Sequence, residues 1–268
     1  MKQLKKALSL MLIMMCISLT ASAYDFEVGG IYYNIVSSES KTVSVTYATT
    51  DYNSYSGNVT IPTDVTNEGT EYIITEIGSN AFKKCSSLTS VSIPSGVTSI
   101  GSAAFSSCSS LTSVNIPNGV TSIERSAFYG CSNLTSVEIP SSVTSIDSFA
   151  FSDCTALTSV TIPNGVTKLA SWAFYQCTGL TKVNIAYGVT KIDACVFDGC
   201  SGLTEVILPS TITSVTGVFD NCTNLCSVSI NYKDEADFTN CVSNTSVFLN
   251  NYIKELEHHI LINSSFAS

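Results

Sequence analysis

A phenylalanine recurs along this chain at an almost constant spacing. The first is followed by five more at intervals of 23 residues and by a seventh after 22. The seven positions are Phe82, Phe105, Phe128, Phe151, Phe174, Phe197 and Phe219. A cysteine, a leucine, a valine and an isoleucine repeat with the same step. A fixed period of about 20–50 residues indicates a solenoid, in which each unit buries its apolar face against the next.

Each unit contains two short extended segments. Leu88, Val91 and Ile93 place apolar residues so that alternate side chains point inward, which predicts a short strand. Pro94 ends that strand, because proline has no N–H to donate to a ladder. Residues 97–100 predict a second short extended segment.

Between the strands, the unit contains a compact segment at 104–108. Phe105 and Cys108 are three residues apart, which is the spacing that places two side chains on one face of a helix. We therefore expect a short helical turn in each unit. Short parallel strands joined by short helical turns make the predicted fold an α/β repeat.

The N-terminus has the features of a secretory signal peptide. Three lysines lie within the first six residues, an apolar segment covers residues 7–20, and the small residues Ala-Ser-Ala end at Ala23. This order is typical of a signal that is removed after export. We expect residues 1–23 to be cleaved between Ala23 and Tyr24, and the protein to be secreted or displayed at the cell surface.

The charge of the mature chain excludes one class of partner. Without residues 1–23, nine Lys and Arg (12 minus 3) stand against 21 Asp and Glu, so the net charge is −12. Binding to a nucleic acid backbone needs clustered cations, so we expect no nucleic acid partner. After the signal peptide the sequence contains no second long apolar run, and we expect no transmembrane segment.

The remaining chain divides into three parts. Residues 24–72 predict a β-rich N-terminal cap, in which Gly29 and Gly30 form a two-residue hairpin turn. A cap is needed because the first unit of a solenoid would otherwise expose its apolar cross-section. Residues 73–231 hold about seven repeats, and residues 232–268, where the pattern fails, are expected to form a C-terminal cap.

The repeat resembles a known family. The sequence CSSLTSVNIPNGVTSIERSAF, from Cys108 to Phe128, resembles the BspA-type leucine-rich repeat, and YDFEVGGIYY, from Tyr24 to Tyr33, resembles the start of many secreted members. The resemblance implies a leucine-rich-repeat solenoid. It also implies a bacterial or protist protein that is secreted or displayed at the surface. Some members of the family are associated with adhesion to host matrix proteins or to other cells. The family has no shared catalytic motif.

We therefore expect a non-catalytic protein without a cofactor that mediates protein–protein or cell-surface adhesion. The expected partners are host or cell-surface proteins, with glycans as the alternative. Two other functions remain open. One is a structural spacer or a fragment of a larger surface protein. The other is a β-solenoid enzyme acting on polysaccharide, which is disfavoured because the outward strand positions hold mostly serine and threonine rather than the paired carboxylates of glycoside hydrolases.

Two sets of residues are candidates for partner contact. Phe149 and Trp172 hold the same position in neighbouring units, two residues before the repeating phenylalanine, and Tyr175 lies nearby. Aromatic residues of this kind are common at interfaces. Lys182 and Asn184 are the outward positions of one predicted strand, on the surface that repeat proteins use for binding. The alternatives are that the rings fold over the turn and cover the core, and that the strand surface is only solvated.

Ten cysteines remain after removal of the signal peptide, and seven of them belong to the repeat. In-register stacking would place their Cα atoms about 5 Å apart, a distance that disulfides allow. However, their Cβ vectors should run parallel and face the core, so we favour small buried apolar residues. A zinc site is disfavoured because no Cys-x-x-Cys spacing occurs. The irregular Cys226 and Cys241 are instead the candidate disulfide that holds the C-terminal cap.

Non-reducing peptide mapping by mass spectrometry tests this pairing. We expect Cys226 and Cys241 to be recovered in one linked peptide, and Cys131 to be alkylated without reduction once the protein is denatured. Recovery of both Cys226 and Cys241 as alkylated thiols without reduction would contradict the predicted disulfide.

Overall fold

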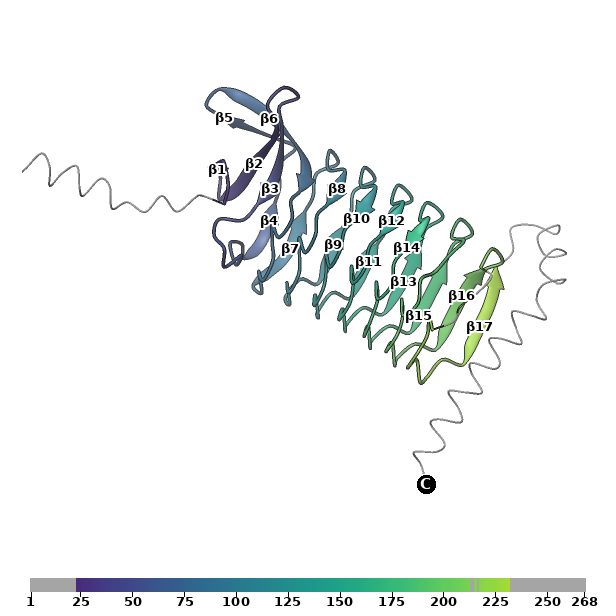
Figure 1. Ribbon diagram of the computed structural model, residues 1–268. Coiled ribbons are helices and arrows are strands. Elements are labelled where there is room, and N and C mark those ends of the chain that lie inside the picture. Colours follow the sequence, from purple (N-terminus) through teal and green to yellow (C-terminus); the bar gives the residue numbers. More distant parts are fainter. Residues whose placement is uncertain (1–22, 213–214, 216, 232–268) are drawn as a thin grey trace, which may run out of the picture.

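The computed structural model describes residues 23–212, 215 and 217–231, and this part of the chain contains seventeen strands and no helix. Its rungs stack side by side along one axis, from a splayed N-terminal cap to the last strand (Figure 1). The turns up to Leu169 contribute strands to two faces, whereas the later turns contribute strands to one face only within the described residues. The protein is therefore a β-solenoid of about seven turns, and the predicted leucine-rich-repeat architecture is confirmed.

One sheet of nine strands runs from the cap into the array. It comprises β1 (Phe26–Val28), β2 (Ile31–Ser37), β3 (Thr42–Thr46), β5 (Asp64–Asn67), β6 (Thr70–Ile77), β8 (Ser99–Ile100), β10 (Ser122–Ile123), β12 (Ser145–Ile146) and β14 (Lys168–Leu169). Antiparallel pairing in the cap gives way to parallel pairing from β6 onward, where β6 pairs with β8 and β8 with β10. The cap thus supplies the first edge on which the repeats build.

The other face is formed by two four-stranded parallel sheets. The first comprises β4 (Gly57–Thr60), β7 (Leu88–Ser92), β9 (Ser113–Asn115) and β11 (Ser136–Glu138). The second comprises β13 (Ser159–Ile162), β15 (Lys182–Ile185), β16 (Glu205–Pro209) and β17 (Ser227–Asn231). The pairing is in register with the sequence period, because Val91 lies opposite Val114 and Val160 opposite Val183.

The expected hairpin is present in the cap. Gly29 and Gly30 connect the antiparallel strands β1 and β2, and their φ angles are +62° and +80°. Two successive positive φ values define the hairpin turn whose twist matches that of the strands, and glycine adopts them without steric cost. The fold of the cap therefore follows from a local sequence signal.

The predicted helical turn is wrong, and with it the α/β class. At 104–108 the chain forms successive tight turns, and alternate N–H groups point to the next rung: Phe105 N donates to Ala127 O and Ser107 N to Tyr129 O, both at 2.7 Å. Ser107 has a φ of +62°. A helix would direct these N–H groups along its own axis to residues four positions earlier, and the bonds between rungs would be lost.

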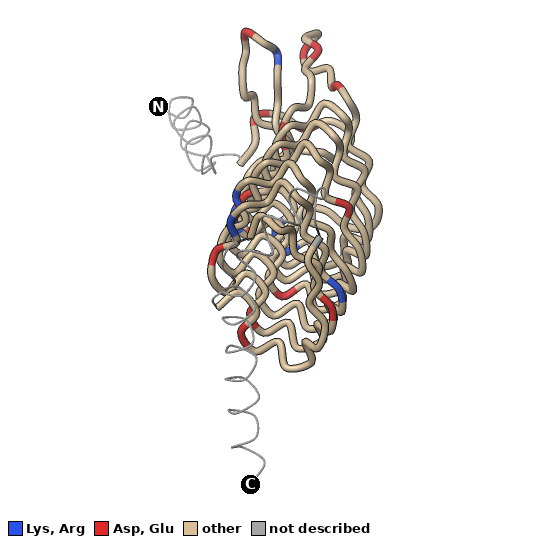
Figure 2. Tube along the Cα trace, turned by 90° about the vertical axis from the view of Figure 1, so that its right-hand side faces the viewer, with Lys and Arg blue, Asp and Glu red and all other residues tan. Residues whose placement is uncertain are grey.

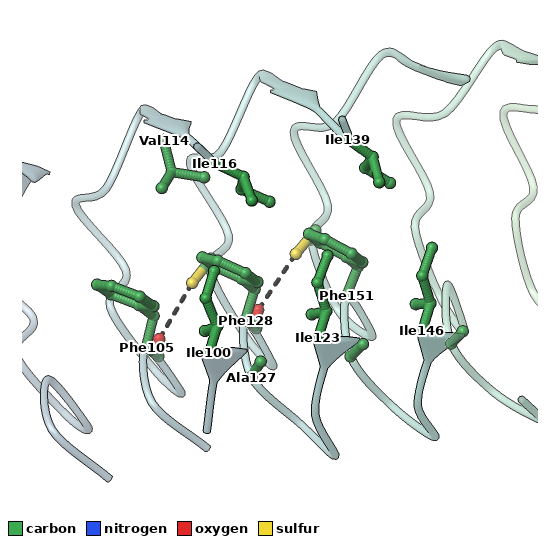
Figure 3. Close-up of a cluster of buried hydrophobic side chains, with 14 of the residues drawn as sticks. Ile100, Phe105, Val114, Ile116, Ile123, Ala127, Phe128, Ile139, Ile146 and Phe151 are labelled. Atoms are coloured by element: carbon green, nitrogen blue, oxygen red, sulfur yellow. Dashed lines mark hydrogen bonds between the residues drawn. The ribbon is translucent and has the colours of Figure 1, made fainter. Parts of the chain in front are cut away.

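The core is a continuous stack of aromatic rings, and apolar strand residues surround it. Figure 3 shows the phenylalanines of three successive rungs lying one behind another, flanked by Ile100, Ile123 and Ile146. The stack begins with Tyr55, and successive centroids lie 4.5, 4.8, 5.1, 5.1, 5.1, 5.3 and 5.5 Å apart along Tyr55, Phe82, Phe105, Phe128, Phe151, Phe174, Phe197 and Phe219. Rings at this spacing leave no room for water between rungs.

Threonine hydroxyls reinforce the contact between rungs at the surface. The Oγ1 of Thr121 donates to the Thr98 carbonyl at 3.4 Å, and the Oγ1 of Thr144 donates to the Thr121 carbonyl at 3.1 Å. A second threonine file does the same, with Thr181 Oγ1 at 3.0 Å from Thr158 O. Each of these carbonyls also accepts the backbone N–H of the same threonine, so the hydroxyl adds a second hydrogen bond between the two rungs at the solvent-exposed surface.

Replacing the central ring tests how far the rungs depend on one another. Phe151 is fully buried between two other rings, so Phe151→Ala should lower the free energy of unfolding by about 3–5 kcal/mol. Urea unfolding followed by circular dichroism measures the change. Ser159→Ala, on the exposed outer side of β13, is the control and should stay within about 0.5 kcal/mol of the parent. A urea unfolding curve of Phe151→Ala equal to that of the parent would contradict the burial of the Phe151 ring in the core.

Candidate functional site

The five residues predicted to contact a partner divide between two faces of the solenoid. Phe149 and Trp172 lie in the turns that follow β12 and β14, and Tyr175 lies three residues after Trp172 in the same turn. Lys182 and Asn184 lie on β15, in the sheet of the other face. The structure therefore places the three aromatic residues in neighbouring turns, with a ring contact between Phe149 and Trp172, and separates them from the polar pair.

Phe149 and Trp172 stack on one another at the surface. Their ring centroids are 5.3 Å apart with an angle of 4° between the planes, and Trp172 keeps 39 % of its surface exposed. The guanidinium of Arg125 lies over the Phe149 ring, 5.7 Å from its centroid. Three rungs thus contribute a cation, a phenyl ring and an indole to one short surface column.

The backbone at this position is left-handed in six successive rungs. The φ angles are +61°, +53°, +57°, +61°, +62° and +61° at Asn80, Ala103, Ser126, Phe149, Trp172 and Cys195. Small or amide side chains suit this conformation, whereas a bulky residue with positive φ is uncommon. The two aromatic residues therefore occupy a position whose backbone does not favour them, and such strain is often found where a side chain serves a function.

The strand surface that carries Lys182 and Asn184 is polar and nearly neutral. Lys182 Nζ lies 2.9 Å from Glu205 Oε1 on the neighbouring strand β16. Two further lysines of these rungs are also paired, Lys168 with Asp147 at 2.6 Å and Lys191 with Asp193 at 2.9 Å. Figure 2 shows charged residues scattered sparsely over the rungs, so this face offers hydrogen-bonding groups rather than a charged field.

The described residues contain neither a metal-binding cluster nor a membrane-spanning helix. In that part of the chain, no group of three or more His, Cys, Asp or Glu side chains could hold a metal ion. The same residues include no helix with the length and hydropathy needed to cross a membrane. What the surface offers, in residues 23–231 apart from the gaps given above, is therefore shape, hydrogen bonds and one aromatic column.

The repeating cysteines line the core as thiols that bond to the backbone. The Sγ of Cys108 donates to the carbonyl of Phe82 at 2.9 Å, and Cys131 makes the same bond to Phe105 at 3.2 Å. Figure 3 shows two bonds of this type as dashed lines. The ladder cysteines are free: Cys85, Cys108, Cys131, Cys154, Cys177, Cys200 and Cys222. Cys226 is also a free thiol in the structure, and its Sγ lies 3.5 Å from the Thr204 carbonyl oxygen. Cys241 lies outside the described residues, so the disulfide between the two stays a prediction.

A family model matches most of the repeat array. It describes the BspA-type leucine-rich-repeat region, with six copies over residues 75–202 and 171–268. The chain belongs to the BspA-type leucine-rich-repeat family. This BspA-type protein also resembles solved structures of bacterial leucine-rich-repeat proteins, which share its repeat architecture. No match is found among curated proteins.

Two of these structures are informative. A leucine-rich-repeat protein from Bacteroides ovatus is 33 % identical, with a TM-score of 0.68 over 77 % of this chain and 53 % of the other. The T. pallidum leucine-rich-repeat protein is 27 % identical, with a TM-score of 0.63 over 75 % of this chain and 90 % of the other. The BspA-type chain thus spans about half the length of its Bacteroides ovatus relative.

Sequence reasoning missed the guanidinium in the aromatic column of this BspA-type protein. Arg125 lies three residues before its repeating phenylalanine, whereas Phe149 and Trp172 lie two residues before theirs. Comparison of equivalent repeat positions therefore does not align Arg125 with the two rings. The detectable signal was only that Arg125 falls in the rung directly before Phe149.

The ladder thiols should make the stability of this BspA-type protein depend on pH. Burial raises the pKa of Cys131 from 9.0 to about 12. At pH values between these two pKa values, the folded chain therefore keeps a proton on this thiol that the unfolded chain loses. The free energy of unfolding should therefore be unaffected by this thiol below pH 9 and should fall above it, by about 1.4 kcal/mol per pH unit for each such thiol.

Urea unfolding at several pH values between about 9 and 10.5 measures this dependence. Cys131→Ala should reduce the slope against pH by about 1.4 kcal/mol per pH unit, whatever its effect on the stability itself. Ser132→Ala, next to Cys131 and partly exposed, should leave the slope unchanged. Equal slopes for the parent and Cys131→Ala would contradict a buried protonated thiol.

Proposed function

We propose that this protein is a non-catalytic binding module that mediates protein–protein or cell-surface adhesion. The observation that carries the proposal is the exposed stack of Phe149 and Trp172 on a surface otherwise formed largely by serine, threonine and asparagine. Buried aromatic anchors dominate the energy of many interfaces, and Trp is among the residues most enriched there. Membership of a family with bacterial surface-type proteins supports the same function.

The rest of the scaffold suits such a function physically. The aromatic column sits on turns that are hydrogen-bonded between rungs. Ala150 O accepts from Phe128 N of the preceding rung at 2.7 Å, and Phe151 N donates to Ala173 O of the following rung at 2.7 Å. A side chain on this ladder loses little further freedom on binding, which lowers the entropic cost of association. The polar surface around Lys182 and Asn184 is a second contact area that adds weak hydrogen bonds.

Export is part of the proposal. Residues 1–22 lie outside the described residues. Cleavage between Ala23 and Tyr24 is supported by the signal-peptide features of the sequence. It is also supported by the position of Tyr24, which cleavage would make the new N-terminus. The Tyr24 ring packs on Tyr32 with centroids 4.7 Å apart, and Asp25 N donates to Tyr33 O at 2.9 Å. A chain beginning at Tyr24 would therefore start within the cap.

A spacer or a fragment of a larger surface protein is the second candidate. The observation in its favour is the length, since the chain covers 53 % of the Bacteroides ovatus protein. A spacer needs a stable stack with a solvated surface, and the exposed Trp172 would then have no partner. The two candidates therefore differ in one measurable property, which is saturable binding through a defined face.

A binding screen of the purified protein against extracellular-matrix proteins and a glycan array tests the proposal. Trp172→Ala should weaken binding about 30-fold or more if Trp172 is an anchor of the interface. Tyr129→Ala, which removes an aromatic residue of similar exposure outside the stack, is the matched control and should bind as the parent does.

The polar face is tested in parallel with Lys182→Glu combined with Asn184→Ala. Loss of binding in this variant, with full binding in Trp172→Ala, would move the site to the sheet of β15. A cooperatively folded protein that binds none of the matrix proteins or glycans would contradict adhesion and favour the spacer.

A further inference from the structure

The surface column contains the only arginine and the only tryptophan of the chain. Arg125 and Trp172 lie on either side of Phe149, with the guanidinium 5.7 Å and the indole centroid 5.3 Å from the centroid of that ring. Arginine and tryptophan are the residue types most enriched among the side chains that dominate binding energy. Their meeting on one exposed feature, two rungs apart, marks the column as a site with its own ligand chemistry.

The hydrogen-bond donors at the two ends of the column have no acceptor in the protein. Arg125 and Trp172 are both exposed. In the part of the chain that the structure describes, the guanidinium forms no ion pair, and neither its N–H groups nor the indole N–H has a hydrogen-bond partner. Three lysines of the neighbouring rungs, by contrast, are each paired with a carboxylate. The donors of the column are therefore free to bind a ligand.

The rings add to the preference for a negative group. Phe149 and Trp172 are within 4° of parallel and cover one face of each other. The face of an aromatic ring carries partial negative charge and its edge partial positive charge, so the ring edges and the indole N–H next to Arg125 favour an acceptor. A guanidinium binds a carboxylate through two parallel N–H···O bonds. The column therefore suits a carboxylate.

Hydroxyl groups surround the single cation. The position of Arg125 is occupied by Ser102, Ser148 and Ser171 in the neighbouring rungs, and all three are partly exposed. The Ser102 hydroxyl donates to the Arg125 carbonyl at 3.1 Å. The chain as a whole has a net charge of −9, which repels ligands with many negative groups. A ligand with one carboxylate and several hydroxyls fits this surface better than an acidic peptide does.

We propose that the column of Arg125, Phe149 and Trp172 binds a carboxylated sugar at the end of an otherwise neutral glycan. The guanidinium would pair with the carboxylate, and the indole N–H would donate to an oxygen of the next sugar. Rungs lie about 4.8 Å apart, so the two donors are about 10 Å apart along the axis, a span of about two sugar rings. This inference rests on the proposed binding function and names its partner as an acidic cell-surface glycan.

The fluorescence of the protein reports on this site, because Trp172 is the only tryptophan. The probe is 3′-sialyllactose, which has one carboxylate, titrated into the purified protein at low salt. We expect a saturable change in emission that weakens as salt screens the ion pair. Lactose and the neutral carboxamide of sialyllactose should give no saturable change. An acetylated and amidated tetra-glutamate peptide tests an acidic protein segment and should also give none.

Substitutions at Arg125 test the ion pair. Arg125→Met keeps an apolar stem against Phe149 but removes the guanidinium, and it should weaken binding about tenfold or more. Arg125→Lys keeps the charge without the fork and should give an intermediate affinity. Lys84→Met removes a positive charge from an exposed site in the first rung and is the matched control, which should bind as the parent does.

Two further variants test the surroundings of the ion pair. Trp172→Phe keeps the ring stack but removes the indole N–H, and calorimetry should show weaker binding of sialyllactose. Glu124→Gln removes the negative charge next to Arg125 in the chain and should bind at least as tightly as the parent. Circular dichroism melts equal to that of the parent would show that these exposed substitutions leave the fold intact.

Several results would overturn the inference. These are an equal response to sialyllactose and its carboxamide, equal binding by Arg125→Met and Lys84→Met, and a response to tetra-glutamate that equals or replaces the response to the sugar. Failure of the inference is distinguishable from failure of the proposed function. If a matrix protein binds and Trp172→Ala abolishes that binding, but sialyllactose gives no response, adhesion stands and the sugar site is wrong. If neither the screen nor the titration gives binding, both proposals fail.

Discussion

Each rung of this solenoid is stabilised mainly by its neighbours, through rings stacked face to face. The repeating phenylalanines from Phe82 to Phe197 are fully buried, and each lies between two other rings. The distance between neighbouring rings is about the spacing of hydrogen-bonded β-strands. The stack fixes the register, since a shift of one residue would move a phenylalanine out of the column. The cap ends the stack with Tyr55, whose hydroxyl donates to the Thr46 carbonyl while its ring packs on Phe82. Because Tyr55 has a hydroxyl at one end and an apolar ring face, it can end the column of rings and also bond to the sheet of the cap.

The period of the sequence predicted most of the fold. The strand positions of the repeats and their inward-facing residues follow from apolar spacing and turn residues, which are local signals. The turn around Phe105 and Cys108 was mispredicted because a spacing of three is shared by a helical turn and by successive tight turns. Hydrogen bonds to the next rung decide between a helical turn and tight turns. One example is the bond from Phe105 N to Ala127 O, whose acceptor lies 22 residues further along the chain. Local spacing contains no information about such bonds.

The candidate site was predicted in part for a related reason. Equivalent positions in neighbouring repeats predict which side chains stack, and Phe149 and Trp172 do so. Arg125 occupies a different position within its unit, so its approach to the column depends on side-chain reach rather than on the period. Lys182 and Asn184, which were predicted as a separate set on a strand, lie on the other face. Their function as contact residues stays a prediction.

The position of the cap has a consequence for how the protein can be made. A chain that is synthesised N-terminus first exposes β1 to β6 before any regular rung, and β6 presents the edge on which β8 pairs. Each further rung needs only the 23 residues that follow and the surface already formed. The order of emergence is thus the order of stacking, and no rung has to wait for a distant part of the chain. Vectorial assembly of this kind limits the time for which apolar units are exposed before they are covered.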